Sequence, residues 1–172
     1  VVATCQGVAR DLGLTDLRFA VGDIASHTPD GPVHLAVSLH ACDTATDDAL
    51  ARAVQWGADV ILAVPCCQHE LSRIWQQEGL APLAEHGILR ERFAALATDG
   101  LRAAALEARG YRTQVVEFID MEHTPKNVLL RAVRGPDDPK RRQAFLAQYA
   151  ATKQHLGLGR IRLDAMVEAS AP

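Results

Sequence analysis

The sequence lacks a hydrophobic run long enough to cross a membrane. Its longest apolar stretch, residues 60–67 with one proline inside it, is far shorter than the roughly 20 residues that a membrane helix needs. The sequence also lacks a strong net charge, since the formal net charge is -3 and the pI is near 6.2. A protein that coats nucleic acid through charge alone is therefore excluded, although a local basic patch is not.

The amino-terminal residues lack an initiator methionine, and they lack the basic segment followed by an apolar one that is typical of a secretory signal. They are typical of the middle of a helix, and we expect the true amino terminus to precede Val1. Four cysteines in such a chain indicate reduced thiols and not a disulfide framework. We therefore expect a cytoplasmic protein with no membrane partner.

What is present is the composition of one soluble globular domain, with 172 residues, 48% of them hydrophobic and 23% charged. Three near-continuous apolar runs, at residues 17–21, 35–39 and 59–64, predict parallel strands covered on both faces. Two β-rich runs, at 113–119 and 128–133, predict a closing hairpin.

Helical spacing of apolar residues predicts helices between and after these strands. Thr46 is expected to cap the first of them and Gly57 to end it. Asp99 and Gly100 are expected to kink a later one, which ends at Gly110. The predicted helices span residues 46–57, 68–77, 89–109 and 140–155.

Strands that alternate with helices predict an α/β sheet, in which ligands bind at the carboxyl ends of the strands. Segments with unusual polar chemistry follow the predicted strands, so we expect them to meet at one edge of the sheet. These segments are residues 22–24 (GDI), 38–43 (SLHACD), 65–69 (PCCQH) and 122–127 (EHTPKN).

The segments SLHACDTATDDAL, VPCCQHEL and EHTPKN together resemble a clade of class I S-adenosylmethionine-dependent methyltransferases. This clade includes bacterial proteins of unassigned substrate and eukaryotic tRNA 2'-O-methyltransferases with a similar A-T-D and C-C pair. The resemblance covers about residues 12–134. It implies a Rossmann-like sheet with helices on both faces, S-adenosyl-L-methionine as cofactor and RNA as partner. We therefore expect a partial methyltransferase domain at 1–134 and a linker with a helical extension at 135–172.

The sequence departs from the family in lacking the glycine-rich loop that approaches the methionine end of the cofactor, and the acidic residue expected to hold the ribose. We expect the first two strands of the fold, including the central one, to precede Val1. The chain alone is then expected to be inactive and to bind S-adenosyl-L-methionine weakly or not at all. Loss of a central strand would also leave an aggregation-prone edge beside residues 17–21 and 35–39.

The resemblance implies roles for residues on the cofactor side of the pocket. Asp23 would accept a hydrogen bond from the adenine amino group and Ile24 would pack on the base, although a turn aspartate is the alternative for Asp23. Asp43 either caps the helix that follows it or takes part in catalysis. The residues that would approach the sulfonium region are Ser38, Leu39 and His40.

The paired cysteines, Cys66 and Cys67, allow three interpretations. A zinc ion could be held by ligands of suitable type, but the spacing is not that of a C-x-x-C knuckle. A thiolate could add to a pyrimidine ring, as the P-C-Q motif of cytosine-5 methyltransferases does. We favour a third interpretation, in which both are small, half-buried groups that shape the acceptor pocket while Gln68 and His69 provide polar contacts. The ligands of the zinc alternative would be His40, Cys42, Cys66, Cys67 and His69.

Three histidines, His40, His69 and His123, are expected near the predicted edge. Because imidazole is a common general base, His40 or His69 could accept a proton from the acceptor. Lys126 and Asn127 would contact a phosphate or fix the acceptor. The alternative is that both residues only belong to a hairpin loop, in which the Asn127 side chain forms a hydrogen bond with its own backbone.

The sequence thus predicts an S-adenosylmethionine-dependent methyltransferase whose acceptor is RNA. A small-molecule or protein acceptor, and a non-catalytic binding module that keeps the fold, are the alternatives. No metal ion is assigned. We assign His40, Cys66, Cys67, His69, Lys126 and Asn127 to catalysis, and Asp23, Ile24, Ser38, Leu39 and His40 to cofactor binding.

Overall fold

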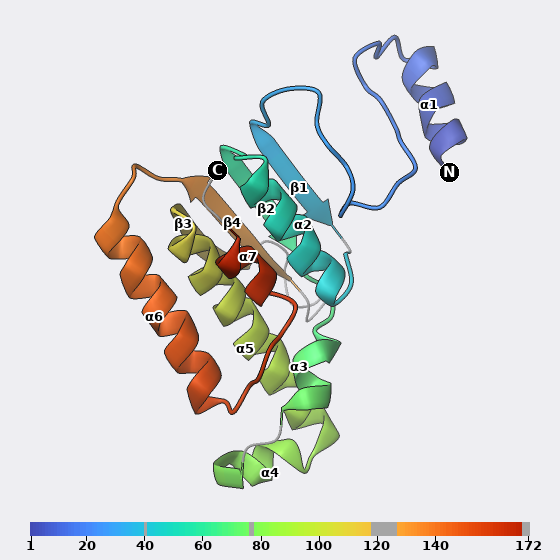
Figure 1. Ribbon diagram of the computed structural model, residues 1–172. Helices are drawn as coiled ribbons and strands as arrows, with labels where there is room; N and C mark the ends of the chain where they lie inside the picture. The colour runs from blue at the N-terminus through green and yellow to red at the C-terminus, as the bar shows by residue number, and fades with distance from the viewer. Residues whose placement is uncertain (40, 76–77, 118–126, 170–172) are drawn as a thin grey trace.

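The computed structural model describes residues 1–39, 41–75, 78–117 and 127–169, and Figure 1 shows the arrangement of their helices and strands. The elements are α1 (Val2–Asp11), β1 (Leu35–Leu39), α2 (Thr44–Gln55), β2 (Val60–Val64), α3 (His69–Ile74), η1 (Glu78–Leu80), α4 (Ala81–Ala84), α5 (Gly87–Ala108), β3 (Tyr111–Glu117), β4 (Val128–Arg134), α6 (Pro139–His155) and α7 (Asp164–Glu168).

The four strands form one mixed sheet in the order β1-β2-β4-β3. β1 and β2 are parallel, whereas β4 runs antiparallel to both β2 and β3. β3 is therefore parallel to β1 and β2, and the carboxyl ends of these three strands lie at one edge of the sheet. The predicted α/β class and the closing hairpin are confirmed.

The hydrophobic core lies between one face of the sheet and the helices in front of it (Figure 1). Ile61 of β2 is paired with Ala132 of β4, and both are buried with Leu50 of α2 and Leu101 of α5. Alternation along a strand sends every second side chain to this face. α2 and α5 therefore cover the same side of the sheet.

The opposite face of β1 is exposed. Leu35, Val37 and Leu39 are 54%, 54% and 61% exposed, and β1 is one of the two edge strands of the described sheet. Helices on both faces were expected, but the described helices that contact the sheet cover one face. β1 therefore presents both an open edge and an apolar face.

Residues 17–21 were predicted to form a strand, and this prediction is wrong. They have no strand conformation, and Val21 is 87% exposed. Their polar groups find local partners instead, since the Phe19 amide donates to Gln6 Oε1 and Gln6 Nε2 donates to the Leu17 carbonyl. A strand needs a neighbouring strand for its backbone hydrogen bonds, and the run does not pair with the sheet.

The helix boundaries follow the predictions closely. α2 ends just before Gly57, whose φ is +65°, and α5 ends before Gly110, whose φ is +91°. Glycine tolerates this left-handed conformation. The kink expected at Asp99 and Gly100 does not interrupt α5, which runs unbroken through both.

The segment after residue 134 contributes to the same core. α6 packs on α5, and α7 packs on α2 and α5. Tyr149, Ile161, Leu163 and Met166 are among the buried core residues. The boundary between a domain at 1–134 and an extension at 135–172 stays a prediction. None of the helices in the described part of the chain has both the length and the apolar character needed to cross a bilayer.

Candidate active site

Three thiols gather at the carboxyl ends of the parallel strands. Cys42 lies in the turn after β1, while Cys66 and Cys67 lie in the turn after β2. The Cys42 and Cys66 Sγ atoms are 3.2 Å apart, and the Cys66 and Cys67 Sγ atoms are 3.9 Å apart. Cys66 and Cys67 are half-buried, whereas Cys42 is exposed. The two polar turns therefore meet at the predicted edge of the sheet.

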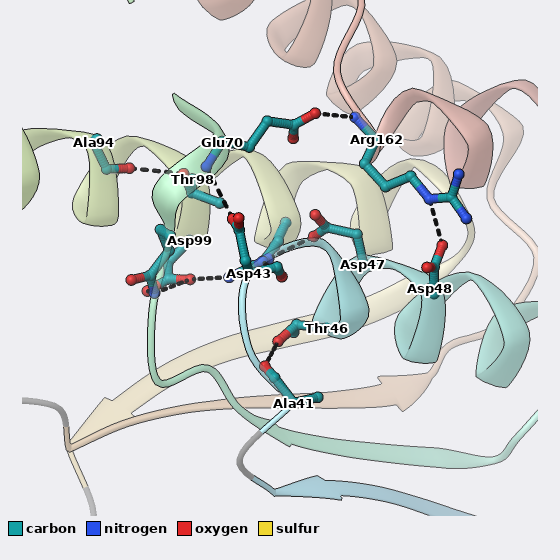
Figure 2. Close-up of polar contacts among 12 residues, drawn as sticks. Ala41, Asp43, Thr46, Asp47, Asp48, Glu70, Ala94, Thr98, Asp99 and Arg162 are labelled. Carbon is teal, nitrogen blue, oxygen red and sulfur yellow. Dashed lines mark hydrogen bonds and ion pairs between the residues drawn. The ribbon is translucent and has the colours of Figure 1, made fainter. Parts of the chain in front are cut away.

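Asp43 joins the same two turns. Its amide donates a hydrogen bond to the Cys67 carbonyl at 3.1 Å. Its Oδ1 accepts a hydrogen bond from the Glu70 amide at 2.9 Å (Figure 2). The Asp43 carboxylate thus caps α3, although the capping alternative placed it on the helix that follows it, α2. Its side chain makes no cap bond to α2. Asp43 reaches across because its backbone has φ 54° and ψ -124°, a conformation that L-residues rarely adopt.

The expected capping residue of α2, Thr46, does not cap it either. α2 begins at Thr44, and the Thr46 hydroxyl donates to the Ala41 carbonyl (Figure 2). Thr46 is fully buried at 1% exposure. This bond holds the turn after β1 against the first turn of α2.

A buried cation, the Arg102 guanidinium, contacts the turn after β1 from the interior of the protein. Arg102 of α5 is 0% exposed and its Nε donates to Asp47 Oδ1 at 2.7 Å. Its two terminal nitrogens donate to Asp99 Oδ1 at 3.0 Å and to the Asp43 carbonyl at 2.9 Å. Gln68 donates to the same Asp99 carboxylate, at 3.1 Å. The Nε2 of Gln68 is thus occupied inside the protein, and the pocket contact expected of Gln68 stays a prediction.

Burial shifts the pKa values of the charged groups in this network. It raises the pKa of Asp47 to about 6, and Arg102 only partly offsets the effect. Burial likewise raises the pKa of Asp99 above its ordinary value. Burial alone would lower the pKa of Arg102, but the two carboxylates outweigh it and raise that pKa. Arg102 is therefore a permanent buried cation beneath the turns.

Sequence reasoning missed this network. Asp99 was expected only to kink its helix, and neither Asp47 nor Arg102 received a role in the site. The available signal was three charged residues on the buried faces of two amphipathic helices, since charged side chains are almost never fully buried unless paired.

The remaining residues of the predicted acceptor side are less closely grouped. His69 is exposed at the first position of α3 and is not within the thiol group. Asn127 is buried and precedes β4, whose Leu130 pairs with Ala63, so it lies beside the carboxyl end of β2. His40, His123, Lys126 and the rest of residues 118–126 lie outside the described residues.

On the predicted cofactor side, Asp23 follows no strand. It is exposed in a turn, where its Oδ1 accepts a hydrogen bond from the Ala25 amide. Ile24 nevertheless reaches β1, because it lines a cavity of about 110 Å³ together with Ser38 and side chains of α2. Leu39 is mostly exposed at the end of β1. Residues 22–24 thus approach β1 from a loop and not from a strand end.

These residues fit S-adenosyl-L-methionine in part. Ile24 and Ser38 offer an apolar wall and a hydroxyl at one cavity, but its volume is below the roughly 300 Å³ of typical ligand pockets. No glycine-rich turn accompanies it in the sequence. The described residues therefore fit one side of a cofactor pocket at most.

A larger cavity, of about 470 Å³, lies elsewhere. It is bordered by the end of α5, the ends of the hairpin strands and α6, and its lining includes Arg109, Arg134 and Arg142. None of the predicted site residues lines it. We place the candidate site at the smaller hollow and the thiols, because the unusual chemistry converges there.

One comparison with known proteins gives a match. Residues 1–74 match a family model described as a methyltransferase domain. No curated protein and no solved structure matches the chain. The matched segment contains β1, β2 and both polar turns, and the mixed sheet is consistent with the Rossmann-like fold of methyltransferases. The comparison therefore supports a methyltransferase domain over the part of the chain that carries the candidate site.

Proposed function

We propose that this chain belongs to an S-adenosylmethionine-dependent methyltransferase whose acceptor is RNA. The observation that carries the proposal is the methyltransferase-domain match over residues 1–74, the segment whose two polar turns are tied together by the Asp43–Cys67 hydrogen bond. RNA as acceptor rests on the resemblance to tRNA 2'-O-methyltransferases. The net charge of -3 adds no general attraction, so RNA would be recognised locally.

On the cofactor side, we assign Ile24 and Asp23 to the adenine, and Ser38 and Leu39 to the region near the sulfonium. Ile24 would pack on the base and Asp23 would accept from its amino group. The bound cofactor supplies an electrophilic methyl carbon. His40 belongs to the same proposed set.

On the acceptor side, the chain must align a nucleophile and remove its proton. Alignment of the reacting atoms is the main requirement of methyl transfer. We assign proton acceptance to His69, which is exposed at the start of α3, two residues after Cys67 in the sequence. Cys66, Cys67 and Asn127 would border the acceptor, and Lys126 would contact a phosphate.

Nucleoside mass spectrometry of RNA from cells that lack the gene tests the acceptor. We expect one methylated nucleoside to disappear and to return with the wild-type gene. A gene that carries His69→Ala should restore this nucleoside poorly. The rate of methyl transfer should fall by about 100-fold or more, because general base catalysis contributes about that much. His155→Ala, another exposed histidine, is the matched control and should restore it fully. An unchanged nucleoside profile would exclude RNA and favour a small-molecule or protein acceptor.

Calorimetric titration of the 172-residue chain with S-adenosyl-L-methionine tests the cofactor assignment. We expect weak or no binding, because the sequence contains no glycine-rich loop for the methionine end. Any heat of binding should be lost in Ile24→Asp, which puts a charge at the cavity wall. Tight binding by these residues alone would contradict the expectation.

A further inference from the structure

The thiol group has the dimensions of a metal site. Zinc–sulfur bonds of about 2.3 Å in a tetrahedron separate neighbouring sulfur atoms by about 3.8 Å. The observed separations are 3.2 Å for Cys42–Cys66 and 3.9 Å for Cys66–Cys67, and all three Sγ atoms lie within 4.8 Å of one another. Small rotations about the side-chain bonds would bring the three sulfurs to one ion.

The two turns that carry the thiols are fixed relative to each other. The Asp43 amide bonds the Cys67 carbonyl directly after Cys42, and the Asp43 carboxylate holds the start of α3 directly after the cysteine pair. The Arg102 guanidinium binds the Asp43 carbonyl from the buried side. A metal site needs ligands held in place before the ion arrives, and these contacts supply that support.

We propose that Cys42, Cys66 and Cys67 bind a zinc ion as a three-thiolate site. Thiolates are the ligands that soft cations such as zinc prefer. Binding would release three thiol protons and form three Zn–S bonds, with no oxidation or reduction. Because Cys42 is exposed, the fourth position of the tetrahedron faces solvent and would take a water molecule or a ligand.

The other chemistry open to this group is a Cys42–Cys66 disulfide. A disulfide would bring two sulfur atoms to about 2.05 Å and leave Cys67 unused. The structure instead brings the third thiol into the same small volume. Zinc accounts for all three, whereas a disulfide accounts for two.

The test is zinc binding by the reduced, metal-stripped chain, followed by removal of loose metal and measurement of zinc per chain. Wild type should retain about one ion. Cys42→Ser, Cys66→Ser and Cys67→Ser should each weaken binding at least about 10-fold. Cys5→Ser is the matched control, because Cys5 lies in α1 outside the thiol group, and it should bind as wild type does.

A second measurement does not depend on the variants folding. Zinc should slow alkylation of Cys42, Cys66 and Cys67 in the wild type while Cys5 reacts at an unchanged rate. The proposal is overturned if zinc protects none of the three thiols, if Cys42→Ser keeps wild-type affinity, or if mass spectrometry finds a Cys42–Cys66 disulfide in place of a metal complex. These assays contain neither S-adenosyl-L-methionine nor RNA, so their failure is separate from failure of the proposed function.

Discussion

Asp43 is the one described non-glycine residue with a positive φ. Such a conformation costs about 1–3 kcal/mol and persists only where surrounding contacts hold it. Here the contacts are the bond from the Glu70 amide, the bond to the Cys67 carbonyl and the bond from Arg102. The strain places one carboxylate between the two turns of the candidate site.

Asp43→Ala should lower the free energy of unfolding by about 1–2 kcal/mol, because it removes the side-chain cap of α3. Asp43→Asn keeps an oxygen that can accept from the Glu70 amide and should stay close to wild type. Urea denaturation measures both. Equal losses in the two variants would show that the hydrogen bond is not the cause.

Asp164 is a carboxylate that several hydrogen-bond donors hold in its charged form. Its carboxylate accepts hydrogen bonds from Lys153, from the Tyr149 hydroxyl at 2.7 Å and from the Ile161 amide at 2.8 Å. Burial alone would raise the pKa of Asp164, but these bonds outweigh it and lower the pKa below its ordinary value of 3.8. The folded state therefore binds this proton less readily than the unfolded chain does.

The sign of this shift sets a pH dependence. A lowered folded-state pKa adds stability above the unfolded value of 3.8, and the gain is lost as pH falls below it. Asp164→Asn should cost about 2 kcal/mol at pH 7, and its difference from wild type should shrink as pH falls below 3.8. Urea midpoints across pH measure this difference. A difference that stays constant with pH would exclude the charge of Asp164 as its source.

At the scale of elements, side chains from three helices lock the site together. Arg102 of α5 pairs with Asp47 of α2 and with Asp99, which also accepts from Gln68 at the start of α3. On the outer side, the Arg162 guanidinium binds Asp48 of α2, and the Arg162 backbone amide donates a hydrogen bond to the Glu70 carboxylate of α3 (Figure 2). The positions of α2 and α3 beneath the turns are thus set by ionic contacts as well as by apolar packing.

Arg102→Met should lower the free energy of unfolding by about 3–5 kcal/mol, because it leaves two buried carboxylates without a cation. Arg92→Met in the same helix is the control, and since Arg92 is exposed it should change stability by less than about 0.5 kcal/mol. Thermal and urea unfolding measure both. A small effect of Arg102→Met would mean that water or another group compensates the carboxylates.

At the scale of the whole molecule, the sheet has one protected side and one open side. The helices cover the face of Ile61 and Ala132, while the other face of the edge strand β1 exposes Leu35, Val37 and Leu39. α1 lies beyond β1 at the end of a long connection (Figure 1). An exposed apolar edge strand is a template for pairing with another chain.

We expect the isolated chain to self-associate through β1 and Val37→Lys to reduce that association, because a charge on an edge strand opposes pairing. Its stability should change by less than about 0.5 kcal/mol, since Val37 is 54% exposed. Val37→Ile keeps the apolar surface and should associate as wild type does. Light scattering over a concentration series measures this. Unchanged association in Val37→Lys would locate the contact elsewhere.

Local patterns in the sequence were enough to predict the strands near 35–39 and 60–64, the hairpin and the helix ends at Gly57 and Gly110. Runs of apolar residues and glycines report local conformation directly, because periodicity and backbone sterics act within a few residues. The same logic located two polar turns at one edge of the sheet. The same reasoning was wrong at residues 17–21, which are apolar but do not pair with a neighbouring strand in the described sheet.

Which polar groups meet depends on the packing of the whole fold. Cys42 and Cys66 are 24 residues apart, and Arg102 and Asp47 are 55 residues apart. No local pattern specifies such pairs, because a buried charge is satisfied by whichever partner the packing of the helices brings within hydrogen-bond distance. The thiol group, the capping of α3 by Asp43 and the buried Arg102 network all follow from that packing.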